Sequence, residues 1–414
     1  MKIAVIGAGI VGMCTAFELA QDGHEVSIFE RNSSVAQEAS FACAGHLSPS
    51  LSHPLALPAW PHGAWLRAVS ARSPLSVGKG FGLSDLKWLL GWKTPGRDFP
   101  ANLAAAFALA AYSLEQLHKR ATQAALAFEQ SQGNLLLWQS EAELAQHQER
   151  LKILKEAGLV SQVLTAAEAR ALEPALQSDY AFAAASYFPG DEIGNCRQFA
   201  HLLKDKLTQS GAQLHFGTPV SGISSTSGIQ IRTADGVTHD VDQVVICAGT
   251  GSAALGLPGL QSLPLTTVWS YSLSAPIREP LNAPRSAVQD CRNHVTISRI
   301  GARVRVAGGA EIGSHNQGND EKTVKQLYRS LNTLFPGAAD FSRNAQLWKG
   351  ASQFTPDGVP LIGPGSGPGI WLNLGHGQNG WTMAAGSARI IADLVSGRQT
   401  ELDISRLHPG RFQR

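Results

Sequence analysis

The chain has 414 residues, a net charge of +2, 43% hydrophobic residues and 42 glycines. This length exceeds what one simple core needs and favours two domains, and the glycine content suits an α/β enzyme with many tight turns. The nearly neutral charge, without a marked run of one sign, argues against nucleic acid as a main partner.

Cysteine and histidine usage excludes further classes. The five cysteines are widely spaced and form no C-x-x-C pair, which argues against a disulfide framework and a zinc knuckle. Reduced thiols in the cytoplasm fit this pattern best. The 13 histidines include no metal-binding pair such as H-E-x-x-H, so no metal is predicted. No apolar run reaches the about 18 residues that a membrane span needs.

The N-terminus carries the most informative motif. Lys2–Ile6 is predicted to be a buried strand, a helix is expected from Val11 to about Asp22, and a second strand is expected at Glu25–Phe29. A G-x-G-x-x-G run joins the first strand to the helix. This order explains the segment better than a secretory signal peptide does.

Each glycine of the motif has a physical role in a dinucleotide site. Gly7 permits the tight turn, Gly9 lets the backbone approach a pyrophosphate, and Gly12 lets the helix pack closely on the strand. The helix N-terminus offers free N–H groups to the phosphates. Glu30 follows at the distance where an acid accepts hydrogen bonds from a ribose. The motif alone does not choose between FAD and NAD.

The remaining elements are predicted from periodicity and turn residues. Helices are expected at Asn102–Gln132, Glu141–Ala157, Thr165–Ala171, Phe199–Ser210, Asp320–Leu334 and Trp381–Ser396. Strands are expected at Asn134–Gln139, Gln213–Phe216, Ile229–Thr233, Asp242–Gly249, Trp269–Leu273, Val295–Ile300, Arg303–Ala307, Val359–Ile362 and Gly369–Leu374. Asp242–Gly249 has the pattern of a buried parallel strand that returns the chain to the nucleotide domain.

The predicted fold class is therefore α/β (α+β overall). A Rossmann-like, FAD-binding domain is combined with a discontinuous second domain, built on a mixed or antiparallel β-sheet with helices. Residues 1–48, 188–254 and 350–414 are assigned to the first domain, and residues 49–187 and 255–349 to a substrate or cap domain.

Two loops favour a flavin. The small residues of Ser40–Ser48 allow the backbone to lie against a flat ring, and His46 at its centre either hydrogen-bonds substrate or flavin or only caps the loop. The second loop has Gly375, Gly377 and Gly380 before the last helix. Its free N–H groups and the helix dipole would stabilise the negative charge that a flavin gains on reduction. A nicotinamide needs no such stabilisation, so this loop favours FAD over a nicotinamide cofactor. The alternative is a glycine turn that binds no phosphate.

Two further segments carry open alternatives. Thr355–Gly363 is expected to set a turn and to do no chemistry. Trp269 and Tyr271 share one face of a strand, where they either line a substrate cavity or pack in the core.

Taken together, these residues resemble the small-subunit type of D-amino acid dehydrogenase, within the D-amino acid oxidase and glycine oxidase family of flavoproteins. The resemblance covers essentially the whole chain. The motifs that carry it are VIGAGIVG at Val5–Gly12, AGHLSP at Ala44–Pro49, FPGDEIGNCRQF at Phe188–Phe199, YSL at Tyr271–Leu273, TPDGVPLIG at Thr355–Gly363 and the long segment Trp371–Arg398.

The resemblance implies non-covalent FAD and hydride transfer from the α-carbon of an amino acid to flavin N5. The imine would hydrolyse to a 2-oxo acid and ammonia, and electrons would pass to a membrane quinone or another acceptor in preference to oxygen. The cofactor-binding candidates are Gly7, Gly9, Ile10, Val11, Gly12, Glu30, Arg31, Ser40, Ala44, Gly45, His46, Val220, Ala248, Gly249, Gly375, His376, Gly377 and Gly380. The substrate-side candidates are His46, Tyr271 and Ser352.

One departure from the family pattern concerns the substrate. The family usually has G-L-R-P before the T-P-D-G segment, and its arginine holds the substrate carboxylate; here Ser352 stands in the arginine's place, followed by Gln353. Neither residue replaces the charge of a bidentate arginine. Trp269-Ser270 likewise replaces the usual Lys-Gly. The candidates for a substitute cation that holds the carboxylate are Arg299, Arg303 and Arg305. The alternative is that they are ordinary surface charges.

Several alternatives stay open. The substrate is either a D-amino acid, a cyclic or N-substituted amino acid such as a proline derivative, or an amine without a carboxylate. A flavin-binding subunit of a larger complex is a different class, and a nicotinamide enzyme is a weaker option. The stretch Leu55–Arg97, rich in tryptophan and basic residues, suits either contact with the inner face of the cell membrane or a cap over the active site. An oligomer is compatible with these features.

Overall fold

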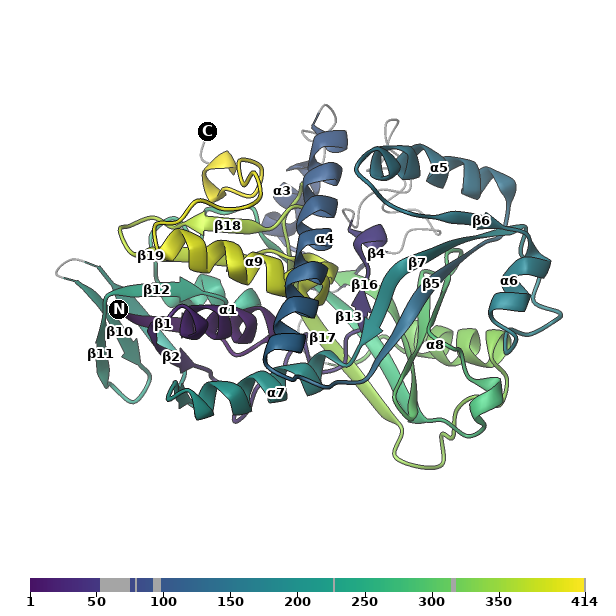
Figure 1. Ribbon diagram of the computed structural model, residues 1–414, viewed down its shortest axis with the longest axis horizontal. Coiled ribbons are helices and arrows are strands. Elements are labelled where there is room, and N and C mark those ends of the chain that lie inside the picture. Colours follow the sequence, from purple (N-terminus) through teal and green to yellow (C-terminus); the bar gives the residue numbers. More distant parts are fainter. Residues whose placement is uncertain (53–74, 79, 92–97, 226–227, 314–317, 413–414) are drawn as a thin grey trace.

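Two large β-sheets lie at opposite ends of the molecule, and the long helix α4 (Phe99–Gln123) runs between them (Figure 1). The computed structural model describes residues 1–52, 75–78, 80–91, 98–225, 228–313 and 318–412. The architecture is mixed α/β, as the sequence predicts.

The first sheet has six strands in the order β18-β19-β12-β1-β2-β8. They are β1 (Lys2–Ile6), β2 (Glu25–Phe29), β8 (Gln213–His215), β12 (Gln243–Ile246), β18 (Leu361–Pro364) and β19 (Ile370–Leu374). All neighbouring pairs are parallel except β18 with β19. Its central strands are largely apolar and buried on both faces, as expected of a covered parallel sheet, whereas the edge strand β8 is partly exposed.

Three helices cover one face of this sheet: α1 (Ile10–Gln21), α7 (Cys196–Gln209) and α9 (Gly380–Val395). A small antiparallel sheet of β9 (Val220–Ser224), β10 (Ile229–Thr233) and β11 (Thr238–Val241) packs its isoleucines against the other face. This arrangement confirms the strand–helix–strand unit predicted for the N-terminus and the returning parallel strand predicted before Gly249.

The second sheet has ten strands, with the path β17-β13-β16-β15-β14-β5-β7-β3; β4 pairs with β16 and β6 with β7. Its strands are β3 (His46–Leu47), β4 (Leu75–Val77), β5 (Gln130–Trp138), β6 (Gln162–Leu164), β7 (Ala184–Gly194), β13 (Thr266–Pro276), β14 (Ala287–Asp290), β15 (Val295–Ile300), β16 (Arg303–Ile312) and β17 (Gln346–Phe354). One face packs against α8 (Glu321–Leu334) in an apolar core.

Shorter elements complete the described part of the chain. The helices are α3 (Leu83–Gly91), α5 (Glu141–Glu156) and α6 (Ala166–Leu172). The 3-10 turns are η1 (Pro49–Leu51), η3 (Gly249–Leu255), η4 (Pro280–Asn282), η5 (Gly377–Asn379) and η6 (Pro409–Phe412). Thr165 caps α6 with a capping box, which agrees with the helix predicted to begin there.

The helix predicted over Asn102–Gln132 is wrong at its C-terminal end, because α4 ends at Gln123 and β5 begins at Gln130. Ala125 adopts a left-handed φ of +50°, and the Leu126 amide bonds back to the carbonyl of Ala121. The apolar pattern continues because the chain beyond this turn packs on the same core. A helix terminus of this kind does not interrupt the hydrophobic periodicity, so the periodicity does not predict where the helix ends.

Strand β7 was not predicted. It crosses the large sheet between β5 and β3, although it contains Pro189 and Gly190, which read as a break in a strand. The predicted domain boundaries at 188 and 350 fall inside β7 and β17, and both strands belong to the ten-stranded sheet. The rest of the domain division stays a prediction.

Candidate active site

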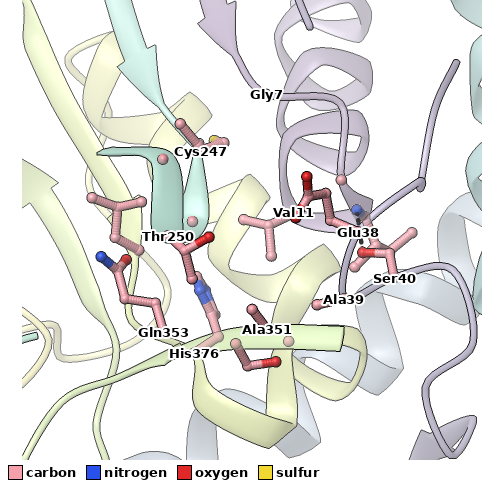
Figure 2. Close-up of a pocket in the computed structure, with 18 of the residues that line it drawn as sticks. Gly7, Val11, Glu38, Ala39, Ser40, Cys247, Thr250, Ala351, Gln353 and His376 are labelled. Carbon is pink, nitrogen blue, oxygen red and sulfur yellow. Dashed lines mark hydrogen bonds between the residues drawn. The ribbon is translucent and has the colours of Figure 1, made fainter. Parts of the chain in front are cut away.

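A cavity of about 400 Å³ opens where β1, β2 and β12 end. Parallel sheets bind ligands at this edge. In Figure 2, Gly7, Val11 and Ser40 lie on one side of the cavity, Cys247 and Thr250 on another, and the strand that carries Ala351 crosses below them. Segments from the whole length of the chain therefore meet at this site.

The glycines of the first motif differ in what they do. Gly7 has a φ of +106°, and a Cβ there would lie 2.7 Å from the Cys247 carbonyl oxygen. A Cβ on Gly12 would lie only 1.9 Å from the Gly7 carbonyl oxygen, whereas one on Gly9 would meet only Ser40 Oγ at 3.5 Å. Gly7 and Gly9 line the cavity with Ile10 and Val11, but Gly12 does not. Gly12 therefore packs the helix on the strand, as the sequence predicts, and its assignment to the cofactor-binding set stays a prediction.

Glu30 stands at the end of β2 and lines the cavity. Its Oε2 atom accepts a 2.7 Å hydrogen bond from the Ala8 amide, and its Oε1 atom accepts bonds of 2.8 Å from the amide and side chain of Asn32. Arg31 lines the cavity beside it and forms an ion pair with Glu38 at 2.6 Å. The carboxylate is therefore fixed at the rim of the cavity, and its contact with a ribose hydroxyl stays a prediction.

The small-residue loop is held by α1 and by the large sheet. The Ile10 amide donates to Ser40 Oγ at 3.0 Å, and Ser298 of the large sheet donates to the Ala44 carbonyl at 2.9 Å. Gly45 has a φ of +88°, and its carbonyl accepts a 2.8 Å bond from the Gly194 amide. The loop thus lines the cavity with its backbone, as a flat ring requires.

Two buried histidines line the cavity without charge. Burial lowers the pKa of His46 to about 4 and that of His376 to about 3, so both are neutral near pH 7. The ring nitrogens of His46 lie 3.2 Å from the hydroxyls of Ser48 and Thr296. His46 therefore orients the loop as a neutral hydrogen-bonding group.

The C-terminal glycine loop forms the opposite wall. Gly375 and Gly377 have φ values of +75° and +56°, and a Cβ on either would lie within 3 Å of Thr355 or Phe354. Gly380 begins α9, and the N-terminal end of this helix borders the cavity. The helix dipole thus faces the space where the sequence predicts the flavin ring.

The lining fits a large cofactor with polar groups. Within the described residues, four buried polar atoms of the lining have no hydrogen-bond partner: Gln353 Oε1, Asn373 Oδ1, His376 Nε2 and Trp381 Nε1. A buried polar atom is costly when unpaired, so each is available to a ligand or to water. The N-terminus of α1 after the glycine turn, the acid at the end of β2 and the helix dipole at the far end match the successive parts of FAD.

The wall formed by β17 is neutral. Ala351, Ser352 and Gln353 line the cavity there. Among the described residues, the charged side chains of the lining are Glu30, Arg31 and Glu38, which lie at the nucleotide end. The position where the family usually has arginine therefore faces the cavity, and in this chain Ser352 places a hydroxyl there.

Tyr271 lies outside the described lining of the cavity. It is 2% exposed, its hydroxyl donates to Glu311 at 2.8 Å, and it accepts a 3.0 Å bond from the Asp320 amide. The predicted shared face with Trp269 is present, because Lys349 Nζ lies 5.1 Å and 5.4 Å from the two ring centroids. Of the two alternatives for Tyr271, the geometry matches core packing.

The three candidate arginines also lie outside the described lining. Arg303 donates to the side chain and carbonyl of Ser274, and Arg299 is on the neighbouring strand β15. Arg305 comes nearest, because its Nη1 atom donates to the Cys43 carbonyl at 2.8 Å and Cys43 lines the cavity. None of them takes the place of the missing arginine directly.

The remaining predicted cofactor residues, Val220, Ala248 and Gly249, line the cavity. The sequence did not single out several others: Glu38, Cys43, Cys196, Thr250, Gln353 and Trp381. Cys196 and Trp381 lie inside the motifs at Phe188–Phe199 and Trp371–Arg398, and Gln353 was noted beside Ser352, but no role was predicted for any of them.

This chain belongs to the family of FAD-dependent oxidoreductases, whose family model (DAO) matches residues 2–394. The family assignment confirms the predicted fold class and FAD as the cofactor. Among curated relatives, a D-amino acid dehydrogenase from Cereibacter sphaeroides is 36% identical over all of this chain and 95% of its own length. One from Bradyrhizobium diazoefficiens is 34% identical over all of this chain and 99% of its own length.

Solved structures share the fold at lower identity. Glycine oxidase from Geobacillus kaustophilus has a TM-score of 0.77 and 23% identity, with 99% of this chain and 98% of that chain covered. L-proline dehydrogenase from P. horikoshii has a TM-score of 0.76 and 19% identity, with 100% and 98% covered.

Proposed function

We propose that the protein is an FAD-dependent dehydrogenase that oxidises an amino acid, foremost a D-amino acid. The observation that carries this proposal is the 33–36% identity to D-amino acid dehydrogenases over the whole chain. The cavity supports it, because its nucleotide end, ring loops and substrate wall are continuous. When bound, FAD would accept the hydride from the substrate α-carbon at N5. The resulting imine would hydrolyse to a 2-oxo acid and ammonia.

The chain's own residues would hold and tune the cofactor. The N-terminus of α1 would bind the pyrophosphate, with Gly9 leaving room for its approach, and Glu30 would bind the ribose. The loop around Gly45 and the N-terminus of α9 would flank the ring. The positive end of a helix dipole stabilises negative charge beside it, which favours the reduced state.

The two histidines of the described lining are too weakly basic to act as a general base at neutral pH. His46 is neutral and both of its ring nitrogens face hydroxyl groups. We therefore propose that the substrate amine loses its proton before it reacts. The rate of flavin reduction should then rise with pH toward the pKa of the substrate amine.

A second candidate follows from Ser352. The neutral wall of Ala351, Ser352 and Gln353 suits a substrate whose carboxylate is not held by a guanidinium. Cyclic or N-substituted amino acids and amines without a carboxylate fit this description. A flavin-binding subunit of a larger complex would also tolerate the loss of the arginine.

The electron acceptor and the surroundings of the protein belong to the same proposal. Electrons are proposed to pass to an acceptor other than oxygen, such as a membrane quinone. Most of the tryptophan and basic residues of Leu55–Arg97 lie outside the described residues, but Trp88 is buried and donates to the Phe354 carbonyl, so it is no surface anchor. No described helix has the length and hydropathy of a membrane span. Sedimentation with anionic vesicles and light scattering test peripheral membrane contact and oligomerisation.

Anaerobic flavin bleaching tests the function. The purified holoprotein is titrated with D-amino acids, their amides, proline derivatives, N-methyl amino acids and simple amines, and turnover is followed with an artificial electron acceptor. Bleaching by D-amino acids with turnover is the expected result. Bleaching by other amines alone would support the second candidate. A yellow protein that no compound reduces would contradict both and favour the subunit.

A further inference from the structure

Two cysteines from distant parts of the chain meet in the wall of the cavity. Cys43 precedes the loop at Gly45, Cys196 is the first residue of α7, and both line the cavity. The sequence shows only widely spaced, unpaired cysteines. Their meeting is a product of the fold, and no step of the proposed amino acid oxidation uses their thiols.

The pairing of β3 with β7 brings the two segments together. His46 lies opposite Ile193, and the Gly194 amide donates to the Gly45 carbonyl at 2.8 Å. Cys43 lies two residues before Gly45 and Cys196 two residues after Gly194, and their side chains are within hydrogen-bond distance of each other. A contact between the two thiols is the starting geometry that a disulfide needs.

The environments of the two thiols differ. The interaction with Cys196 lowers the pKa of Cys43 to about 7, and the guanidinium of Arg305 adds to this effect. Burial raises the pKa of Cys196 well above its ordinary value. Arg305 is held in place by its 2.8 Å bond to the Cys43 carbonyl. Cys43 is therefore the reactive thiolate, and Cys196 is the thiol that can resolve a bond formed on it.

We propose that Cys43 and Cys196 form a redox-active dithiol, which a low-molecular-weight disulfide converts into an intramolecular disulfide in the wall of the FAD cavity. The Cys43 thiolate attacks one sulfur of the small disulfide and releases one small thiolate. The released small thiolate accepts the proton of Cys196, and the Cys196 sulfur attacks the Cys43 sulfur, which releases the second small thiolate. Two protein thiols are oxidised, and one small disulfide is reduced to two thiols.

The bond would tie the loop around Gly45 to the start of α7. Both segments border the space for the flavin ring, so the tether would restrain the opening through which FAD leaves. It would also close a long loop of the chain, which raises the midpoint of thermal unfolding. The oxidised holoprotein should therefore release FAD more slowly than the reduced form and unfold at a higher temperature.

The test is a thiol count on the full-length holoprotein before and after incubation with glutathione disulfide. We expect two fewer free thiols in denaturant, no retained glutathione, and a cross-link between the Cys43 and Cys196 peptides that dithiothreitol reverses. The variant C196S should retain one glutathione on Cys43, and C43S should lose no thiols. C291S is the matched control and should still lose two, because Cys291 does not line the cavity.

A second measurement does not depend on FAD or on activity. The rate at which Cys43 of the apoprotein reacts with iodoacetamide should rise with a midpoint near pH 7, and C196S should move this midpoint upward. An unchanged thiol count at high glutathione disulfide, a mixed disulfide that persists in the unmodified chain, or a cross-link between Cys14 and Cys247 instead would each overturn the proposal.

Discussion

The carboxylate of Glu30 reaches back to the glycine turn, where its Oε2 atom accepts a 2.7 Å hydrogen bond from the backbone amide of Ala8. The predicted ribose acid thus also fixes the turn that approaches the pyrophosphate. Its other oxygen accepts from Asn32, so the side chain is oriented from both sides. One residue therefore couples the two halves of the nucleotide site.

Replacing this acid should weaken FAD retention. Glu30→Ala leaves the buried Ala8 amide without its acceptor, which costs about 1–3 kcal/mol, and removes the proposed ribose contact. We expect a lower ratio of flavin to protein absorbance after purification. Glu25→Ala, at the exposed start of the same strand, should keep its flavin. A fully flavinated Glu30→Ala protein would contradict the assignment.

Alanine at the two motif glycines should separate folding from cofactor binding. Gly12→Ala places a Cβ 1.9 Å from the Gly7 carbonyl, so α1 cannot pack on β1 and the thermal midpoint should fall sharply. Gly9→Ala meets only Ser40 Oγ at 3.5 Å, so the chain should fold but bind FAD poorly. Circular dichroism melts and flavin fluorescence distinguish these effects. Gly222→Ala, whose Cβ meets nothing within 4 Å, is the control. Equal melting losses in both motif variants would refute the distinction.

Restoring the arginine should shift preference toward carboxylate substrates. Ser352 faces the cavity on β17, and a bidentate guanidinium–carboxylate pair contributes about 1.5–3 kcal/mol. Ser352→Arg should raise kcat/KM for a D-amino acid relative to its amide by about 10- to 100-fold. Ser352→Gln adds length without charge and should not. The preference is measured with matched acid and amide pairs, and an unchanged ratio would show that another group anchors the carboxylate.

Acid should destabilise the apoprotein through His46. Burial lowers the pKa of this side chain from 6.5 to about 4, so the unfolded chain binds a proton that the folded chain refuses. The free energy of unfolding should fall by up to about 3 kcal/mol as the pH drops from 6.5 through 4. Urea titrations of His46→Gln should show a shallower fall, whereas exposed His408→Gln should match the unmodified chain. Parallel curves for both variants would rule out this contribution.

The sequence by itself determined the local elements of the nucleotide site. The strand, the glycine turn and the helix at Lys2–Gln21 depend on periodicity and on backbone angles that only glycine tolerates, and both are written in neighbouring residues. The same holds for the glycine loop before α9. These contacts are short in sequence, so a motif is enough to predict them, and the cofactor follows from their order.

Only the tertiary structure determined which side chains face the cavity and which face the core. β7 forms despite its Pro-Gly pair because neighbouring strands complete it, and this long-range pairing brings the segment of Cys196 beside that of Cys43. Tyr271 faces the core at α8, and Ser352 faces the cavity, because the pairing of β13 with β16 and β17 fixes which side of the sheet each residue occupies. The register of each strand is set by partner strands many residues away in the sequence, so no local sequence pattern predicts it.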